Sequence, residues 1–165
     1  MNVTEFELLS IKGVGKVRAK QVIATLQLAR RLGRPAVNTP QIIRRPQDAI
    51  GLLMPEMRYL QQEHFVVLFL NTKNHLIGRP KTLSIGSLNV AIVTPHMVFR
   101  VAVKLSAASI ICVHNHPSGD PTPSPEDTQL TKRLVESGSI VGVAVLDHLV
   151  LGDGTYTSLK EEGFM

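Results

Sequence analysis

Two histidines and a carboxylate in the C-terminal half of the chain have the types and spacing of metal ligands. His114 and His116 follow a short apolar run, residues 109–113, that is typical of a buried strand. Side chains two apart on a strand point to the same face, so both imidazoles can bind one ion. Asp127 follows a loop rich in proline and glycine that is long enough to bring its carboxylate to the rings. This ligand set suits zinc, which keeps a fourth position open in catalytic sites, better than magnesium or an iron–sulfur cluster.

Each part of this pattern also has an ordinary structural interpretation. A histidine pair at a strand end more often packs or forms hydrogen bonds than binds metal. Ser124-Pro125-Glu126-Asp127 is a capping box, in which two side chains bond to each other's main chain where a helix begins. The interpretations are compatible, because a capped first turn holds a ligand in a fixed position. Their occurrence together favours a metal site.

The elements that must position these residues are mixed along the chain. Helices are predicted over residues 47–62 with an interruption at Pro55, from Thr94-Pro95 onward, and over 126–136. Strands are predicted over residues 64–71, 76–85, 88–93, 109–113, 140–147 and 149–151. Because there is no regular alternation of strand and helix, we expect an α/β fold with a mixed β-sheet flanked by helices.

The N-terminal quarter differs from the rest in charge and composition. Residues 1–45 hold nine Lys and Arg against two Glu, a net charge of +7, whereas the remaining 120 residues have a net charge of −2. Residues 1–33 are predicted to form a small helical hairpin segment around a glycine turn. Residues 34–46 contain three prolines and are interpreted as a linker, so that the main domain covers 47–165.

Composition excludes several classes of protein. A chain of 165 residues with 44% apolar and 19% charged residues is a globular protein, not a disordered one. The single cysteine, Cys112, cannot form an internal disulfide and fits the reducing cytoplasm. The apolar runs are shorter than the roughly 20 residues that span a membrane, and no secretory leader opens the sequence, so neither a membrane location nor secretion is expected. A glycine-rich nucleotide-binding loop is also absent from the sequence.

The whole pattern resembles a known family. His114-x-His116, seven further residues and Ser124-x-x-Asp127 form the JAMM signature of the JAB/MPN+ metallopeptidases, and residues 114–124 resemble the RadC family almost residue by residue. The resemblance covers about residues 47–165 and implies a cytidine-deaminase-like fold. It also implies one zinc ion per chain, held by the two histidines and Asp127, and hydrolysis of a peptide or isopeptide bond.

The same resemblance implies two catalytic residues. A glutamate near the start of the first core strand acts as general acid and base in this family, and Glu63 is the matching position. A carboxylate there can accept a proton from water and pass it to the leaving amine. Glu56 is the nearest competitor for this role. Ser124 matches the serine that is thought to stabilise the oxyanion, although it is also the expected helix cap.

Residues 11–31 resemble a helix-hairpin-helix, a motif whose amides and basic side chains hold a DNA phosphate. The expected DNA contacts are Gly13, Gly15, Lys16, Arg18 and Lys20. RadC-like chains usually carry two such motifs, and this sequence matches only the second, so a purely structural hairpin stays open. The alternative function is accordingly a DNA-binding repair accessory protein whose metal is structural or vestigial. An interaction module without a metal is disfavoured by the intact ligand set.

The remaining candidates rank lower. His148 is expected to be a core residue or to support a metal ligand, and Cys112 to be a buried, inert thiol. His75 and His96 are expected at the surface, and Asp120 in a turn. The sequence specifies neither the substrate nor the oligomeric state, and a dimer stays among the open possibilities.

Overall fold

The computed structural model describes residues 4–32, 41–86 and 93–165. The chain divides into two compact units, Met1–Thr39 and Pro40–Met165. In the described residues, we find no helix with the length and apolar character that crossing a membrane requires.

The N-terminal unit is a pair of helices, α1 (Glu5–Leu9) and α2 (Lys16–Leu32). A capping box starts α1: the Thr4 hydroxyl accepts from the Glu7 amide, and the Glu7 carboxylate accepts from the Thr4 amide. The turn between the helices passes through Gly13, whose φ of +90° is a conformation that glycine adopts without strain. Leu8 and Ala19 are buried between the helices.

The C-terminal unit is built on one five-stranded sheet in the order β2-β1-β3-β4-β5. The strands are β1 (Glu63–Leu70), β2 (Lys81–Gly86), β3 (Ser109–Asn115), β4 (Ala144–Leu151) and β5 (Tyr156–Ser158). The central pair β3 and β4 is parallel, and all other pairs are antiparallel. Every residue of β3 is buried, which places this strand in the middle of the core.

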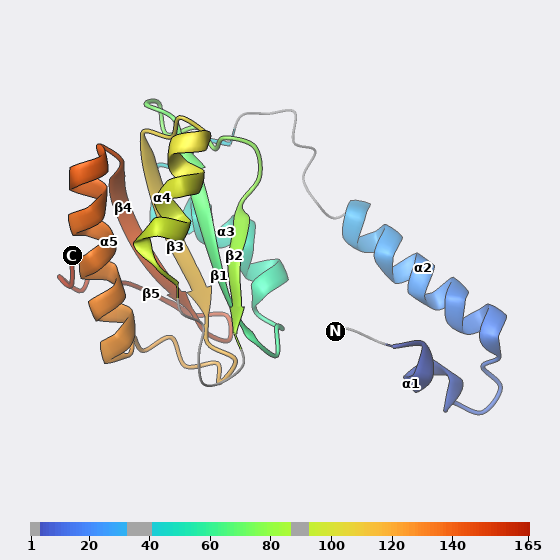
Figure 1. Ribbon diagram of the computed structural model, residues 1–165. Helices are drawn as coiled ribbons and strands as arrows, with labels where there is room; N and C mark the ends of the chain where they lie inside the picture. Colours follow the sequence, from blue (N-terminus) through green and yellow to red (C-terminus); the bar gives the residue numbers. More distant parts are fainter. Residues whose placement is uncertain (1–3, 33–40, 87–92) are drawn as a thin grey trace. The chain divides into compact units, whose positions relative to one another are not determined.

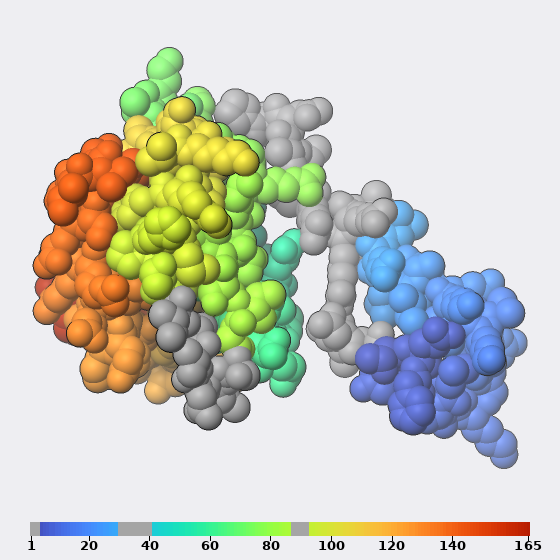
Figure 2. All heavy atoms as spheres, viewed as in Figure 1, coloured from blue at the N-terminus to red at the C-terminus, as the bar shows by residue number. Residues whose placement is uncertain are grey.

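Helices cover both faces of the sheet (Figure 1). On one face α4 (Pro95–Lys104) and α5 (Pro125–Val141) lie side by side and form a continuous surface (Figure 2). Their side chains, including Phe99 and Leu134, pack on Phe69 and Ile110 of the sheet. On the other face α3 (Pro46–Met57) packs on the remaining strand residues. The predicted fold class, a mixed β-sheet flanked by helices, is confirmed.

Several predicted boundaries were wrong for local reasons. Residues 140–141 end α5 and do not begin a strand, because Gly142 caps the helix in the left-handed conformation, with φ of +76°. A single strand, β4, then replaces the two predicted over 140–147 and 149–151. Helix α3 continues through Pro55 but ends at Met57, and β2 begins only at Lys81. The strand predicted over 88–93 falls mostly on residues 87–92, which lie outside the described ranges.

The described segment before α3 belongs to the C-terminal unit. Ile42 forms a β-bridge with His75, and Ile43 is buried in the core on the α3 face. The amides of Arg44 and Arg45 donate to the Asp48 carboxylate, which holds the start of α3. Residues 41–46, part of the stretch interpreted as a linker, therefore pack within this unit.

Candidate metal centre

The site lies where β3 ends. Its residues alternate between the two faces of the sheet, and His114 faces the α4 and α5 side together with Cys112. The His114 ring is fully buried and stacks on Phe65 of the neighbouring strand, with ring centroids 6.3 Å apart. His116 follows just beyond the strand and is half-buried. The end of the central strand and the residue just beyond it therefore supply the two imidazoles.

Asp127 is held by the predicted capping box at the start of α5. The Ser124 hydroxyl accepts from the Asp127 amide at 3.1 Å and donates to Asp127 Oδ2 at 2.7 Å. The Ser124 amide donates to the same oxygen at 2.8 Å. These bonds fix the carboxylate and leave Oδ1 directed at His114. The cap thus positions the third side chain of the group.

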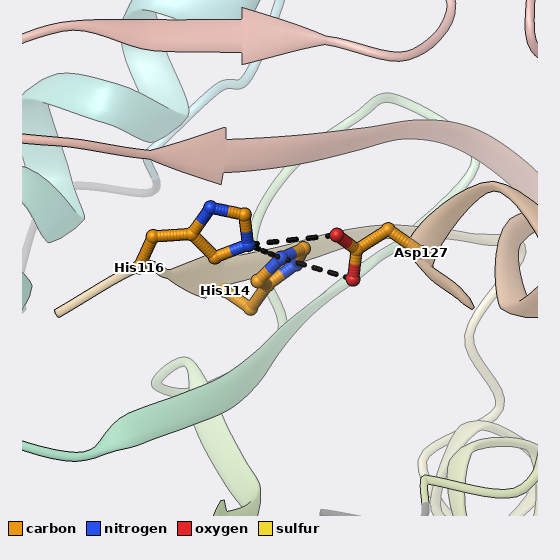
Figure 3. A group of neighbouring side chains, drawn as sticks. All are labelled: His114, His116 and Asp127. Atoms are coloured by element: carbon orange, nitrogen blue, oxygen red, sulfur yellow. Dashed lines mark hydrogen bonds and ion pairs between the residues drawn. The ribbon is translucent and has the colours of Figure 1, made fainter. Parts of the chain in front are cut away.

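The three side chains point toward one another from β3 and α5 (Figure 3). His114 Nε2 lies 3.0 Å from His116 Nε2 and 3.2 Å from Asp127 Oδ1, and His116 Nε2 lies 3.5 Å from Asp127 Oδ2. One nitrogen or oxygen from each residue lies within 4.8 Å of the others, a spacing suited to a shared metal ion. Electron-rich atoms this close attract a cation, either a proton or a metal ion.

The ionisation of the group follows from the same contacts. Partial burial raises the pKa of Asp127, but the two imidazoles and the Ser124 hydroxyl outweigh it and hold the pKa well below its usual value. The Asp127 carboxylate in turn raises the pKa of His116, against the opposing effect of burial, with smaller contributions from the Asp120 carbonyl and Glu63. Asp127 is therefore a carboxylate whenever the protein is folded at neutral pH.

A main-chain carbonyl sets the proton position on His116. His116 Nδ1 lies 2.8 Å from the carbonyl oxygen of Asp120. A carbonyl oxygen only accepts, so Nδ1 carries a proton and, in the neutral ring, Nε2 keeps a lone pair. Asp120 is the predicted turn residue: its carboxylate accepts from the amide and hydroxyl of Thr122. Its main-chain carbonyl nevertheless orients the His116 ring, a role that the residue type did not indicate.

The loop that carries Asp120 is docked against the end of β4. The Asp153 amide donates to the Gly119 carbonyl at 2.8 Å, and the His116 amide donates to the Leu151 carbonyl at 2.8 Å. A Cβ at Gly152 would lie 2.3 Å from the Gly119 oxygen and 2.8 Å from Pro121 Cδ. The close approach of the two loops therefore depends on a glycine at position 152.

Gly152→Ala is expected to displace this loop and to lower the free energy of unfolding by about 1–3 kcal/mol, the usual cost of overpacking. The affinity of the His114, His116 and Asp127 group for a divalent metal ion should fall as well, because the Asp120 carbonyl moves away from His116. Gly51→Ala is the matched control: the added Cβ on α3 meets nothing within 4 Å, and the helix gains about 0.5–1 kcal/mol. Denaturant unfolding and zinc titration of both variants measure these changes. Wild-type behaviour of Gly152→Ala would contradict the prediction.

Glu63 begins β1, beside the strand that carries the histidines. The register pairs Phe65 with His114, so Glu63 precedes that pair by two residues. Its side chain is half-buried and near enough to His116 to raise the pKa of that imidazole. Glu56, the competing glutamate, is exposed on α3. The structure thus brings Glu63 to the site from the adjacent strand.

Asn115, which the sequence analysis missed, holds the start of β1. Its Oδ1 accepts from the His64 amide at 2.8 Å, and its Nδ2 donates to the Gln62 carbonyl at 3.1 Å. These bonds continue the contact between β1 and β3 beyond the last main-chain pair and fix the backbone on both sides of Glu63. The only sequence signal was the place of Asn115 between the two histidines.

His148 lies directly behind His114. The buried His148 ring places Nε2 2.9 Å from His114 Nδ1 and Nδ1 2.6 Å from the Thr131 hydroxyl. Burial, together with the nearby His114, lowers the pKa of His148 well below its usual value, so the ring is neutral. Thr131, one turn beyond Asp127 on α5, was not identified from the sequence. Its spacing of four residues from Asp127 was the available signal.

The other candidates lie away from the group. Burial raises the pKa of the Cys112 thiol, with a smaller contribution from Asp147, so this cysteine stays protonated within the core. His96 is exposed on α4, and His75 is half-buried at the β-bridge with Ile42. None of these three side chains belongs to the described group of His114, His116 and Asp127.

In the N-terminal unit, the predicted DNA contacts surround the turn between α1 and α2. Lys16 and Lys20 are exposed on the first turns of α2. Arg18 is also exposed, but one of its guanidinium nitrogens, Nη1, donates to the Gly13 carbonyl at 3.1 Å. The arginine therefore stabilises the turn, while the two lysines face solvent.

Comparison with known proteins gives a consistent relationship. Residues 43–164 match the family described as RadC-like JAB domain. A UPF0758 protein of Geobacillus sp. (strain WCH70) is 55% identical over 159 residues, which cover 96% of this chain and 70% of the relative. UPF0758 proteins of Desulforamulus reducens and Bacillus cereus are 55% and 56% identical, over 96% and 95% of this chain and 70% and 69% of the relatives. The match to the family spans most of the chain and includes every residue of the His114, His116 and Asp127 group, so the chain belongs to the RadC-like JAB domain family.

Proposed function

We propose that this protein is a zinc-dependent hydrolase of the metallopeptidase or isopeptidase type. One observation carries the proposal: His114 Nε2, His116 Nε2 and the Asp127 carboxylate converge at the end of the central strand. The JAB domain superfamily, which includes metallopeptidases, supports the same reaction class. The chemistry of the site, rather than the fold alone, is the basis of the assignment.

The donor set fits zinc. His116 has a lone pair at Nε2, because its Nδ1 proton is directed to the Asp120 carbonyl, and Asp127 is ionised. Two imidazole nitrogens and one carboxylate oxygen are the three protein ligands of many catalytic zinc sites. A zinc ion held there supplies Lewis acidity and lowers the pKa of water to about 7.

Glu63 is the proposed proton carrier. Its carboxylate accepts the proton of the attacking water and delivers it to the leaving amine. Asn115 keeps this glutamate in place by bonding to the backbone on either side of it. The Ser124 hydroxyl already donates to Asp127 Oδ2, so stabilisation of an oxyanion by Ser124 requires that this bond first breaks. We therefore assign Ser124 primarily to holding Asp127.

The affinity for zinc is expected to fall as the pH is lowered. A metal ligand must be unprotonated, and the pKa of His116 is raised above its ordinary value of 6.5 by Asp127. Protons therefore begin to compete with zinc above pH 6.5, and competition strengthens as the pH falls through the raised pKa. Zinc titration against a chelator between pH 5.5 and about 8 tests this. Protein purified without chelator should hold about one zinc per chain at neutral pH; affinity independent of pH, or no bound zinc, would contradict the proposal.

A second candidate function, contact with DNA, is favoured by the basic N-terminal unit. Lys16 and Lys20 are exposed beside the turn at Gly13, and no acidic residue lies in the first turn of α2. Amides and lysines at such a turn suit a phosphate group. The double variant Lys16→Ala/Lys20→Ala is expected to weaken binding to duplex DNA. The salt dependence of the DNA affinity should fall by an amount that corresponds to roughly two phosphate contacts. Lys104→Ala, on α4, is the control, and an unchanged salt slope would contradict the contact.

A further inference from the structure

We propose that Thr131 and His148 are positioning residues that hold His114 in the tautomer whose unprotonated Nε2 faces the metal. The inference rests on the metal role proposed above and extends it to two side chains that do not themselves touch the ion. Both residues are fully buried, and neither is part of the group of three ligands.

The proton positions follow from Thr131. Its hydroxyl oxygen lies 2.6 Å from the main-chain oxygen of Asp127 and 2.6 Å from His148 Nδ1. A carbonyl oxygen only accepts, so the single hydroxyl proton goes to Asp127. If the hydroxyl donated to His148 instead, two oxygens would face each other at 2.6 Å with no proton between them, which is repulsive. His148 Nδ1 is therefore the donor to Thr131.

The hydrogen bond between His148 and His114 then fixes the proton position on the His114 ring. His148 is fully buried and its two ring nitrogens contact a hydroxyl and another imidazole rather than a carboxylate, so the ring is neutral and a proton on Nδ1 leaves a lone pair on Nε2. That Nε2 lies 2.9 Å from His114 Nδ1 and accepts its proton in a hydrogen bond. In the neutral His114 ring, Nε2 then has the lone pair, and it faces Asp127 Oδ1 at 3.2 Å. The hydrogen bonds from His148 to Thr131 and from His114 to His148, here called the relay, thus leave His114 Nε2 free to bind a metal ion before any metal is present.

The two ligand histidines are oriented from different directions. The Asp120 carbonyl on the exposed loop sets His116, whereas the buried relay sets His114 from inside the core. Thr131 also bonds to the main chain of Asp127, so one hydroxyl supports two of the three ligands. Hydrogen bonds to the outer nitrogen of a ligand histidine typically change metal affinity by 10–100-fold.

The experiment compares Thr131→Val with Thr131→Ser in the full chain. Valine keeps the shape of threonine but removes the acceptor for His148 Nδ1. The His148 ring then gains by carrying its proton on Nε2 and donating to His114 Nδ1, which moves the His114 proton to the metal-facing nitrogen. Zinc affinity of Thr131→Val, measured by chelator competition, is expected to fall about 10–100-fold. Thr131→Ser keeps the hydroxyl and is expected to bind zinc within a few-fold of the wild type.

A spectroscopic measurement gives an independent outcome that a merely structural role would not produce. Long-range ¹H–¹⁵N correlation of the histidine rings in metal-free wild-type protein should show His114 and His148 both protonated at Nδ1. A proton on Nε2 of either neutral ring overturns the relay, even if Thr131→Val fails to fold. Equal zinc affinity of folded Thr131→Val and Thr131→Ser overturns it as well. Neither readout needs a substrate: wild-type protein that binds no zinc would refute the proposed metal centre, whereas the results above refute only the relay.

Discussion

Glu63→Gln is expected to lower amide hydrolysis by about 10²–10⁴-fold, the usual contribution of a positioned general acid and base. Glutamine has nearly the same shape as glutamate but cannot accept a proton. Glu63 is not one of the three proposed ligands, and Asn115 holds the backbone on either side of it through main-chain atoms that the substitution leaves unchanged. Zinc content and the midpoint of thermal unfolding should therefore stay near the wild-type values.

The measurement requires a substrate that the wild type cleaves, chosen by screening peptides and lysine-linked isopeptides. Glu56→Gln is the matched control, because it makes the same chemical change at the exposed competing glutamate on α3. It is expected to retain wild-type activity. Full activity of Glu63→Gln on a substrate that His116→Ala cannot cleave would show that Glu63 is the wrong glutamate. Loss of activity in Glu56→Gln instead would move the role to that residue.

The parts of the candidate site that depend only on local geometry could be predicted from the sequence. Strand β3 places His114 on the site side, His116 follows two residues later just beyond the strand, and the S-x-x-D pattern caps α5. The exact pairing of β1 with β3 is a long-range property, and the position of Glu63 came from the family resemblance. The fold class was predictable because buried strands and amphipathic helices can be recognised in the sequence and pack against one another in layers.

The residues that support the proposed ligands were not predictable from their types. Thr131 and Asn115 are an ordinary helix residue and an ordinary strand-end residue by composition, and their roles depend on contacts across the sheet. The Asp120 carbonyl that bonds to His116 has no sequence signature, because every residue has a main-chain carbonyl. The boundary at residues 140–142 was missed because two apolar residues before a glycine suit a strand and a helix end equally well.

His116→Ala and Asp127→Ala are both expected to lose zinc, from about one per chain to a small fraction, but they should differ in the stability of the metal-free protein. Asp127 accepts two hydrogen bonds from Ser124 and completes the capping box of α5, so its removal costs about 0.5–2 kcal/mol of unfolding free energy, as for other helix caps. His116 is half-buried beyond the end of β3, and its ring bonds to a loop carbonyl. Removing it should cost less than removing the cap.

The pH dependence of this stability difference provides the control. The folded-state pKa of Asp127 lies below the ordinary value of 3.8, so the ionised carboxylate stabilises the folded protein at all pH values above that value. The contribution is lost as the pH falls through the folded-state pKa, because the protonated carboxyl accepts weaker hydrogen bonds. In the presence of a chelator, the gap between wild type and Asp127→Ala should therefore be full at pH 6 and shrink below about pH 4. Glu126→Ala changes an exposed carboxylate in the same turn, and its difference in unfolding free energy from the wild type should be much smaller. A difference equal to that of Asp127→Ala would mean that negative charge at the helix start, not the cap, accounts for the effect.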